Sequence, residues 1–326
     1  LKWETTSQFN VGVDLSLFNN RLRMTADYYR KKTTDLLNNV EMPRSSGYTT
    51  ALRNIGSIRN SGFELQLDGR IIDRAVKWDL GVNFSLNRSK VLVLSEDKDI
   101  FGGELDNTIL KDQLNLMRVG EPMYVFYGYV EDGYDENGHI VYKNMDDDPA
   151  ITAADKTIIG DPNPDFLVNL TTAVSYKGFT LSAFFQSSIG NDIYSLSMAA
   201  QAYDYGYNGN TLREVYYNHW TPENPTAKYP NLDQTSYKMS DRFVYDGSFV
   251  RLKNLELAYD VPCARSKFIK RARVYVSAQN LFTITSYPFW DPDINANGGG
   301  SSMIQGVDSY CYPSARTYTI GCRLTF

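Results

Sequence analysis

The chain has 326 residues, 42% of them hydrophobic and 22% charged, with a formal net charge of −5. This acidic balance, with an isoelectric point near 5.2, argues against nucleic acid as a partner. No apolar run approaches the roughly 20 residues that a transmembrane helix needs, so a helical membrane protein is excluded.

Hydropathy and aromatic content leave two all-β classes open. The mean hydropathy of −0.39 is typical of a soluble protein, but a membrane barrel turns only every second strand residue toward lipid and keeps a polar average. The 24 Tyr, 16 Phe and 4 Trp residues fit the aromatic girdles of a barrel or the stacking surface of a sugar-binding protein. A Tyr-rich soluble β-sandwich is the alternative that composition does not reject.

Two segments show the clearest strand pattern. Residues 9–17 are apolar at every odd position, and residues 76–86 are apolar at every even position. Strands of about 11 residues are longer than the usual 5–6 and match the 9–11 needed to cross a bilayer at a tilt. Length therefore favours a membrane barrel. Residues expected to face lipid are Val11, Val13, Leu15, Leu80, Val82 and Phe84; Asp14, Asp79 and Asn83 are expected to face the interior.

Seven further strands fit this pattern, which brings the expected total to about nine. Their polar faces carry charged and amide side chains that would be costly in a dry core but suit a water-filled lumen. One strand slips in phase between Leu252 and Leu255, which predicts a β-bulge around Lys253 and Asn254. The seven begin near Leu22, Phe63, Phe166, Phe179, Val250, Val274 and Tyr318.

The connections alternate between short and long. Short turns are expected near residues 19–20, 73–74 and 177–178, with a moderate turn over 262–270. Long links without a strand pattern fill residues 35–52, 95–165, 191–241 and 287–312. Outer-membrane barrels have short periplasmic turns and long extracellular loops, whereas compact soluble domains seldom hold so many long loops. The last three links should therefore share the extracellular rim, with Asn19, Asp73, Lys177 and the C-terminus on the periplasmic side.

The ends of the sequence indicate part of a larger barrel. The sequence opens in mid-pattern with Leu1 and Lys2, without an initiator Met or a signal peptide. About nine strands would leave two open edges, and unpaired backbone groups in hydrocarbon cost several kcal/mol each. We therefore expect residues 1–326 to be the C-terminal part of an all-β transmembrane antiparallel β-barrel, whose other strands come from an N-terminal portion.

The final segment is a candidate assembly signal. Residues 316–326 alternate to the end, and Tyr318, Ile320 and Phe326 share one apolar face. A strand that ends on an aromatic residue resembles the sorting strand that the barrel-assembly machinery reads by strand pairing. Tyr318 and Phe326 are therefore predicted to direct insertion into the membrane. The alternative is a strand that happens to end in Phe.

Six segments of the chain carry a family resemblance. They are NIGSIRNSGFELQLDG (54–69), VGEPMYVFYGY (119–129), IIGDPNPDF (158–166), FFQSSIGNDIY (184–194), FVRLKNLELAYDVP (249–262) and VYVSAQNLFTIT (274–285). In this order, and over nearly the whole chain, they resemble the C-terminal half of the SusC-like (SusC/RagA) TonB-linked outer-membrane transporters of Bacteroidetes. Six segments in the family's order are far more specific than any one of them.

The resemblance implies a barrel of about 22 strands, with an N-terminal plug domain and a TonB box that lie outside this sequence. It also implies a Gram-negative outer-membrane location, energy coupling through TonB, and a surface SusD-like lipoprotein that lids the barrel. Family substrates are mostly oligosaccharides, with peptides for a minority branch. Oligosaccharide import is therefore expected and peptide import is the alternative, because the six segments do not separate these cargoes.

A second motif lies in the longest expected loop and has the spacing of an EF-hand-type calcium loop. Position 6 of such a loop calls for Gly with positive φ, but here it is Pro149, whose φ is fixed near −65°. A solvated acidic loop is therefore the alternative to a Ca²⁺ site, and we expect no other cofactor. The ligands would be Asn144, Asp146, Asp148, Ala150 through its carbonyl, and Asp155, at positions 1, 3, 5, 7 and 12.

Aromatic residues in the long loops are candidate cargo contacts. A flat ring can stack on the apolar face of a sugar, which suits a glycan importer. For any one ring, packing between loops or against the lid lipoprotein is the more common role. The set is Tyr203, Tyr205, Tyr207, Trp220, Phe289, Trp290, Tyr310 and Tyr312; Tyr205, Trp220, Trp290 and Tyr310 are the four candidates for substrate binding.

Catalysis has little support, and we expect no enzyme activity. His139 and His219 are the only histidines, both in expected loops, and neither has a Cys or a nucleophile elbow nearby. The three Cys residues are scattered and indicate neither a disulfide framework nor a metal site. Carboxylate pairs for glycoside hydrolysis look the same in sequence as surface and lumen charges.

Three functions remain open from the sequence. The first is TonB-dependent import of nutrients, and the second is a passive structural or adhesive outer-membrane barrel that lacks a plug and a TonB box. The third is a soluble carbohydrate-binding sandwich, which would be extracted without detergent. A SusD-like lipoprotein encoded next to the gene would decide the class, and adjacent hydrolases or peptidases would indicate the cargo.

Overall fold

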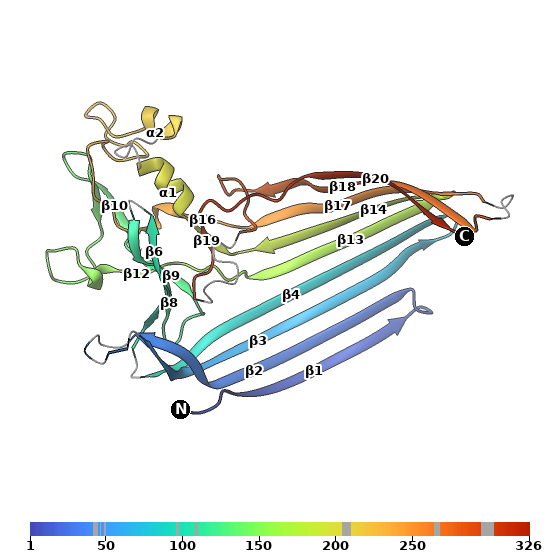
Figure 1. Cartoon of the computed structure of the whole chain (residues 1–326), viewed down its shortest axis with the longest axis horizontal. Helices are drawn as coiled ribbons and strands as arrows, with labels where there is room; N and C mark the ends of the chain where they lie inside the picture. The colour runs from blue at the N-terminus through green and yellow to red at the C-terminus, as the bar shows by residue number, and fades with distance from the viewer. Residues whose placement is uncertain are drawn as a thin grey trace.

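A computed structural model describes the chain except for residues 42–44, 46, 49, 96–97, 108–109, 204–209, 264–267 and 295–302. Nine long strands form one sheet, and all neighbouring strands are antiparallel (Figure 1). The predicted strand number is confirmed. In sheet order the strands are β1 (Thr5–Leu17), β2 (Leu22–Glu41), β3 (Thr50–Asp73), β4 (Val76–Leu94), β13 (Phe166–Tyr176), β14 (Phe179–Ile189), β17 (Phe249–Val261), β18 (Arg271–Thr285) and β20 (Thr317–Thr325).

The β2–β3 hairpin is longer than predicted. β3 begins at Thr50 rather than near Phe63, and β2 continues to Glu41, so most of the expected 35–52 link is paired strand. Two register shifts in this stretch, together with Gly56 at a φ of +151°, interrupt the alternation of side chains. The sequence pattern could not reveal a strand whose period-2 signal is broken by irregularities.

The predicted β-bulge in β17 is confirmed. Leu252 pairs with Phe185 of β14, and Asn254 pairs with the preceding residue, Phe184, so Lys253 has no partner of its own in that ladder. The same interruption occurs against β18. Because the extra residue restores the apolar positions to one side, β17 keeps a single apolar face on both sides of the bulge.

The sheet has one apolar face and one polar face, as predicted. Cross-strand pairing aligns apolar residues into rows, since Leu67 lies opposite both Met24 and Val82, and Val82 lies opposite Leu170. We call this the outward face. Most of its large side chains are accessible, because no other described part of the chain covers them. The next residue along each strand points to the opposite, inward face.

Aromatic rings border the apolar rows at both ends. Phe84 stacks with Phe166 at a centroid distance of 5.8 Å and lies 6.4 Å from Phe63. Nearer the short turns, Phe179 and Tyr259 lie 4.4 Å apart. Barrels carry such a pair of aromatic girdles where an apolar band meets the two membrane surfaces.

The last three long links, which follow β4, β14 and β18, lie together at one end of the sheet, which we call the loop end, and the short turns lie at the other, the turn end (Figure 1). The predicted grouping of the links is therefore confirmed. Among the residues that the structure describes, no helix is long and apolar enough to cross a membrane.

The expectation that these links lack strands and helices is wrong. They form a structured unit, which we call the loop layer, around a core that includes the fully buried Phe126 and Tyr194. Its elements are β5 (Ile100–Phe101), β6 (Glu104–Asn107), β7 (Leu110–Gln113), β8 (Asn115–Met117), β9 (Val125–Gly128), β10 (Glu131–Tyr134), β11 (Ile140–Tyr142), η3 (Ala153–Asp155), β12 (Thr157–Gly160), β15 (Asp192–Ser195), α1 (Leu196–Tyr203), α2 (Arg213–Tyr217), η5 (Asp241–Phe243), β16 (Val244–Asp246) and β19 (Val307–Asp308).

Candidate functional site

The inward face of the sheet is a polar wall. Thr25 donates a hydrogen bond to Asp14 at 2.7 Å, and Arg273 lies 3.4 Å from Glu256 on the neighbouring strand. These charges face open space rather than a dry core, so water can solvate them and no large desolvation cost arises. A wall of this kind suits the lumen of a water-filled barrel.

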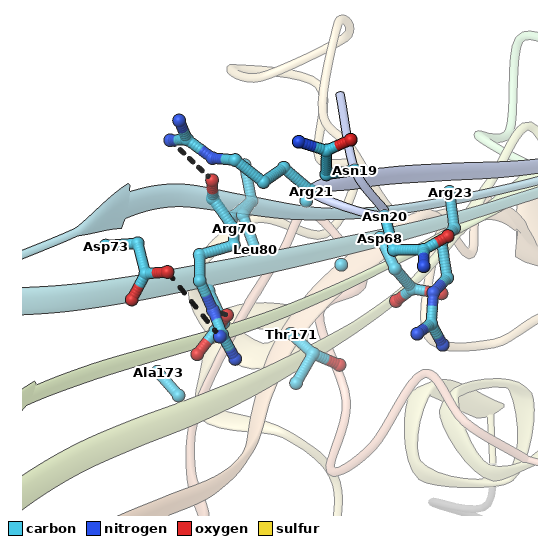
Figure 2. A pocket seen from close by; sticks show the side chains of 13 residues that line it. Asn19, Asn20, Arg21, Arg23, Asp68, Arg70, Asp73, Leu80, Thr171 and Ala173 are labelled. Atoms are coloured by element: carbon cyan, nitrogen blue, oxygen red, sulfur yellow. Dashed lines mark hydrogen bonds and ion pairs between the residues drawn. The ribbon is translucent and has the colours of Figure 1, made fainter. Parts of the chain in front are cut away.

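A polar hollow of about 590 Å³ lies on this face near the turn end. Figure 2 shows Arg70 in its middle, where the guanidinium lies 2.9 Å from Asp79 and 3.9 Å from Asp73. Arg21 donates to the carbonyl oxygens of Arg70 and Ile71, both at 3.2 Å, which fixes the hairpin ends together. The paired charges and exposed amides of this hollow can bind a hydrated polar group or a polar protein surface.

At the loop end, the loop layer folds onto the inward face. Val91 of β4 is fully buried against Met117 of the loop layer. The backbone of Val91 exchanges two hydrogen bonds of 2.9 Å with residues 120 and 121, and the Met123 N–H donates to Ser89 at 3.1 Å. The loop layer therefore covers part of the interior rather than spreading over the outside.

A buried arginine fixes the last long link to the sheet. Arg251 of β17 is 1% exposed, and its guanidinium donates to Thr283 at 2.9 Å, to Ser314 at 3.1 Å and to Asp291. Burial would raise the pKa of Asp291, but the N–H groups of Ser314 and Asp293 and the guanidinium hold that pKa below its ordinary value. A buried charge pair that keeps all these partners is a rigid attachment, because loss of one partner would leave the other unpaired. No local sequence pattern marks this cluster, because its members come from β17, β18 and the last long link.

A second ion pair organises the loop layer itself. Arg242 of η5 lies against Glu131 of β10, and its Nε donates to both carboxylate oxygens, at 2.7 and 2.9 Å. Burial alone would lower the pKa of Arg242, but the contacts with Glu131 raise it.

The adjacent Tyr203 stacks on Tyr237 with a centroid distance of 3.8 Å and is 4% exposed. This aromatic residue of the candidate set is therefore part of the core.

The described cargo candidates each contact a different part of the chain. Trp220 packs on the turn at Gly138, where an added Cβ would lie 2.2 Å from the indole. Trp290 is 57% exposed and stacks on Phe289 at 4.7 Å. Tyr310 is 51% exposed, and its N–H donates to Ser197 at 2.6 Å. Tyr205 and Tyr207 lie outside the described residues. A shared cargo surface formed by these four candidates stays a prediction.

Two exposed rings lie outside the candidate set. Tyr216 and Tyr217 of α2 are 61% and 68% exposed, and their rings contact each other edge to face at 5.2 Å. Tyr312, a member of the candidate set, is 91% exposed. Two adjacent Tyr residues in a loop were the available signal, since neighbouring residues of a short helix cannot both point into a core.

The candidate calcium loop is held by its own backbone. Asp146 and Asp148 each accept a hydrogen bond from the N–H two residues further on, at 2.9 and 3.0 Å. Asp155 is buried and accepts from the N–H groups of Met145 and Thr152, both at 2.7 Å, and these bonds lower its pKa. Within the described part of the chain, no three His, Cys, Asp or Glu residues converge on a point where a metal could bind. Calcium binding by this loop, with Asn144 and the Ala150 carbonyl among the ligands, stays a prediction.

The predicted assembly strand is an edge strand. Among the described strands β20 pairs only with β18, and Tyr318 lies opposite Ala278. Tyr318 and Phe326 are each 71% exposed. Their accessibility is compatible with recognition by another protein, and their role in assembly stays a prediction.

Comparison with known proteins adds three findings. Residues 1–281 match the family model described as "TonB dependent receptor-like, beta-barrel". The chain is 34% identical over 348 residues to TonB-dependent receptor P3 of Formosa agariphila, and 30% identical over 338 residues to TonB-dependent receptor SusC of Bacteroides thetaiotaomicron. All of the chain is covered in both alignments, which span 34% and 32% of those two receptors.

The same fold occurs in solved structures of a transporter. The chain superimposes on the RagAB peptide transporter with a TM-score of 0.84 at 29% identity, covering 99% of this chain and 35% of that one. The chain thus spans about a third of the length of the relatives it matches.

Proposed function

The chain belongs to the TonB-dependent receptor β-barrel family, and we propose that it forms part of the wall of an outer-membrane channel that imports a nutrient in a TonB-dependent manner. The observation that carries this proposal is the division of the nine-stranded sheet into an apolar outward face and a charged inward face. A polar solute could pass along the inward face without contacting lipid. The relatives are named as receptors and transporters, which supports a role without catalysis.

The loop end would face the outside of the cell in this proposal. Long loops on the extracellular side and short turns on the periplasmic side are the general arrangement in outer-membrane barrels. The loop layer would then be the first part of the wall to meet cargo, and a surface SusD-like lipoprotein would close over it. TonB would act through a plug that occupies the lumen, where the polar hollow around Arg70 offers charged contacts.

Oligosaccharides are the cargo we propose. The exposed rings of Trp290, Tyr216 and Tyr217 are suited to stack on sugar faces. Peptides are the second candidate, and the specific observation in their favour is the similarity to the RagAB peptide transporter. Both cargoes are polar and hydrated, so the inward face accommodates either.

Uptake by living cells would test the proposal. Cells with the intact receptor, with the receptor deleted, and with TonB deleted would be given fluorescent oligosaccharides or fluorescent peptides of matched size. We expect accumulation of one cargo class that requires both the receptor and TonB. Accumulation that needs the receptor but not TonB would indicate a passive barrel, and equal uptake in all three strains would contradict an import function.

The cargo class would follow from the same experiment. Preferential uptake of oligosaccharides supports the first candidate, and preferential uptake of peptides replaces it with the second. Ala substitutions of Trp290, and of Tyr216 with Tyr217, then test the loop rings. We expect weaker uptake with unchanged receptor abundance if these rings contact cargo.

A further inference from the structure

The outward face of β2, β3 and β4 carries a group of cations at the loop end. Each of them lies an even number of residues from an apolar outward residue of its own strand, and no register shift interrupts these stretches. They therefore point away from the lumen, on the same side as Tyr28, Phe63 and Leu86. The group consists of Arg30 and Lys32 of β2, Arg59 of β3, and Arg88 and Lys90 of β4, and we call it the cation row.

The cross-strand register places like charges side by side. Lys32 lies directly opposite Arg59, and Arg59 lies directly opposite Lys90. Opposed residues on neighbouring strands have Cβ atoms about 5 Å apart, and like charges in this position destabilise a sheet. A bound anion would offset the repulsion among these three adjacent cations.

The chain itself supplies an anion to only one member among the described residues. Asp165 lies 2.7 Å from Arg88. In the described part of the chain, no carboxylate lies within 4 Å of Lys32, Arg59 or Lys90, and Arg30 likewise has no such partner there. Arg59 is half-buried, while Lys32, Lys90 and Arg30 are exposed.

The cations cannot turn inward at this level of the sheet. The inward positions next to them are held by Ile58 and Val91, which pack against Met117 of the loop layer. The inward positions beside Arg59 and Lys90 are thus occupied by buried side chains, so the charges stay on the outside of the wall.

The cation row lies just beyond the aromatic girdle. Arg59 lies four residues before Phe63 along β3, and Lys90 lies six residues after Phe84 along β4. At about 3.4 Å per residue, these cations lie roughly 14–20 Å along the strand from the rings, less when measured across a tilted wall. Across a wall tilted by about 45° this is roughly 10–14 Å, which places the cations beyond the hydrocarbon, on the polar side of the girdle. At the loop end of β17 and β18, by contrast, the outward residues Val250 and Ile284 are apolar.

We propose that the cation row is a binding site for lipid-headgroup phosphates in the leaflet at the loop end. Phosphate oxygens accept charge-assisted hydrogen bonds from Arg and Lys, and several cations around one headgroup offset their mutual repulsion. The identity of the lipid rests on the proposed function, in which the loop end faces the outside of the cell. In that orientation the lipid is the phosphorylated glycolipid of the outer leaflet, lipid A. The row would fix one lipid against β2–β4 and define the depth of the barrel on that side.

Titration of lipid into the purified protein tests the site. The receptor, extracted from its outer membrane in detergent, would be mixed with lipid A, with dephosphorylated lipid A, with phosphatidylglycerol or with inorganic phosphate, and bound lipid counted by native mass spectrometry. The variant combines Lys32→Gln, Arg59→Gln and Lys90→Gln. The matched control combines Arg74→Gln, Lys77→Gln and Lys177→Gln, which remove the same charge from the turn end.

We expect lipid A to bind the unchanged receptor and the control equally. It should bind the variant about 100-fold more weakly, because each of the three lost cations should weaken binding by roughly fivefold. Dephosphorylated lipid A should bind weakly to all three proteins. The single change Arg59→Lys keeps the positive charge and should keep most of the affinity. Binding by this variant would also show that a wall altered at position 59 still folds.

Three results would overturn the proposal. They are equal lipid A binding by the variant and the control, binding of inorganic phosphate as tight as that of lipid A, and preference for phosphatidylglycerol over lipid A. Because no cargo is present, a failure of the import proposal in cells would leave this measurement unaffected.

Discussion

The sheet and the loop layer are held together in different ways. Every residue of β1 is exposed, and most large side chains of the outward face are accessible. The loop layer, in contrast, has a dry core in which Phe126 and Tyr194 are fully buried, with ring centroids 6.1 Å apart. The sheet therefore depends on backbone pairing and on lipid, whereas the loop layer depends on burial of its own apolar side chains. Changes that act on one region should leave the other largely intact.

The largest expected effect is in the loop-layer core. Phe126→Ala should cost about 3–5 kcal/mol because it leaves a cavity beside Tyr194. Hydrogen exchange should then show opening of the loop layer while amides of the nine-stranded sheet stay protected. Phe101→Ala is the matched control, since Phe101 is 38% exposed and should tolerate the change. Loss of protection in both regions at once would mean that they unfold as one unit.

The next largest effect on stability is expected when a charge is introduced on the outward face. Val82→Arg should cost about 2–4 kcal/mol in lipid, because the guanidinium would lie in hydrocarbon. Ser85→Arg, three residues along the same strand on the inward face, should cost far less. Reversible folding of the protein into lipid vesicles, followed in urea, measures both free energies. Equal costs at the two positions would contradict the assignment of the faces.

A smaller, pH-dependent effect is expected at Asp155. Hydrogen bonds lower its pKa below the ordinary value of 3.8, so its contribution to stability is present above that value and is lost as the pH falls through the lower, folded pKa. Limited proteolysis of the 144–155 loop should therefore increase only below about pH 4. Asp155→Asn should make the loop sensitive at neutral pH, whereas the exposed Asp147→Asn should not. Sensitivity that is unchanged in Asp155→Asn would show that these hydrogen bonds do not hold the loop.

The smallest effect on stability is expected at the C-terminal edge. Deletion of Phe326 should lower the amount of receptor in the membrane without changing cargo affinity in receptors that insert, because the aromatic end would serve recognition by the barrel-assembly machinery. Trp290→Ala should show the reverse pattern if Trp290 contacts cargo. Surface abundance and affinity, measured separately on both variants, distinguish them. Normal abundance with lost binding after deletion of Phe326 would exclude a sorting role.

The sheet could be predicted well because its signal is local. Alternation over residues 76–86 identified β4, and the phase slip near Lys253 identified the bulge. The hairpin before Phe63 was missed because register shifts around Gly56 break the alternation. A strand with irregular pairing leaves no period-2 pattern in the sequence.

The loop layer could not be predicted because its contacts join distant parts of the chain. Arg251 contacts Asp291 and Ser314, and Asn115 donates to the carbonyl of Gln305 at 3.1 Å. Contacts between residues so far apart leave no periodic pattern in the sequence. The same limit applies to the candidate aromatics: Tyr203 and Trp290 look alike in sequence, yet Tyr203 is in the core and Trp290 is exposed. The cation row is likewise visible only through the register of three strands.

The most direct test of the account is an accessibility scan along β4 in the outer membrane. Cys263, Cys311 and Cys322 would be replaced by Ser, and single Cys residues at positions 78 to 86 would carry spin labels. Accessibility should alternate with a period of two: labels at even positions should relax with oxygen dissolved in lipid, and labels at odd positions with a water-soluble nickel chelate. Accessibility that does not alternate, or that places Val82 in water and Asn83 in lipid, would contradict it.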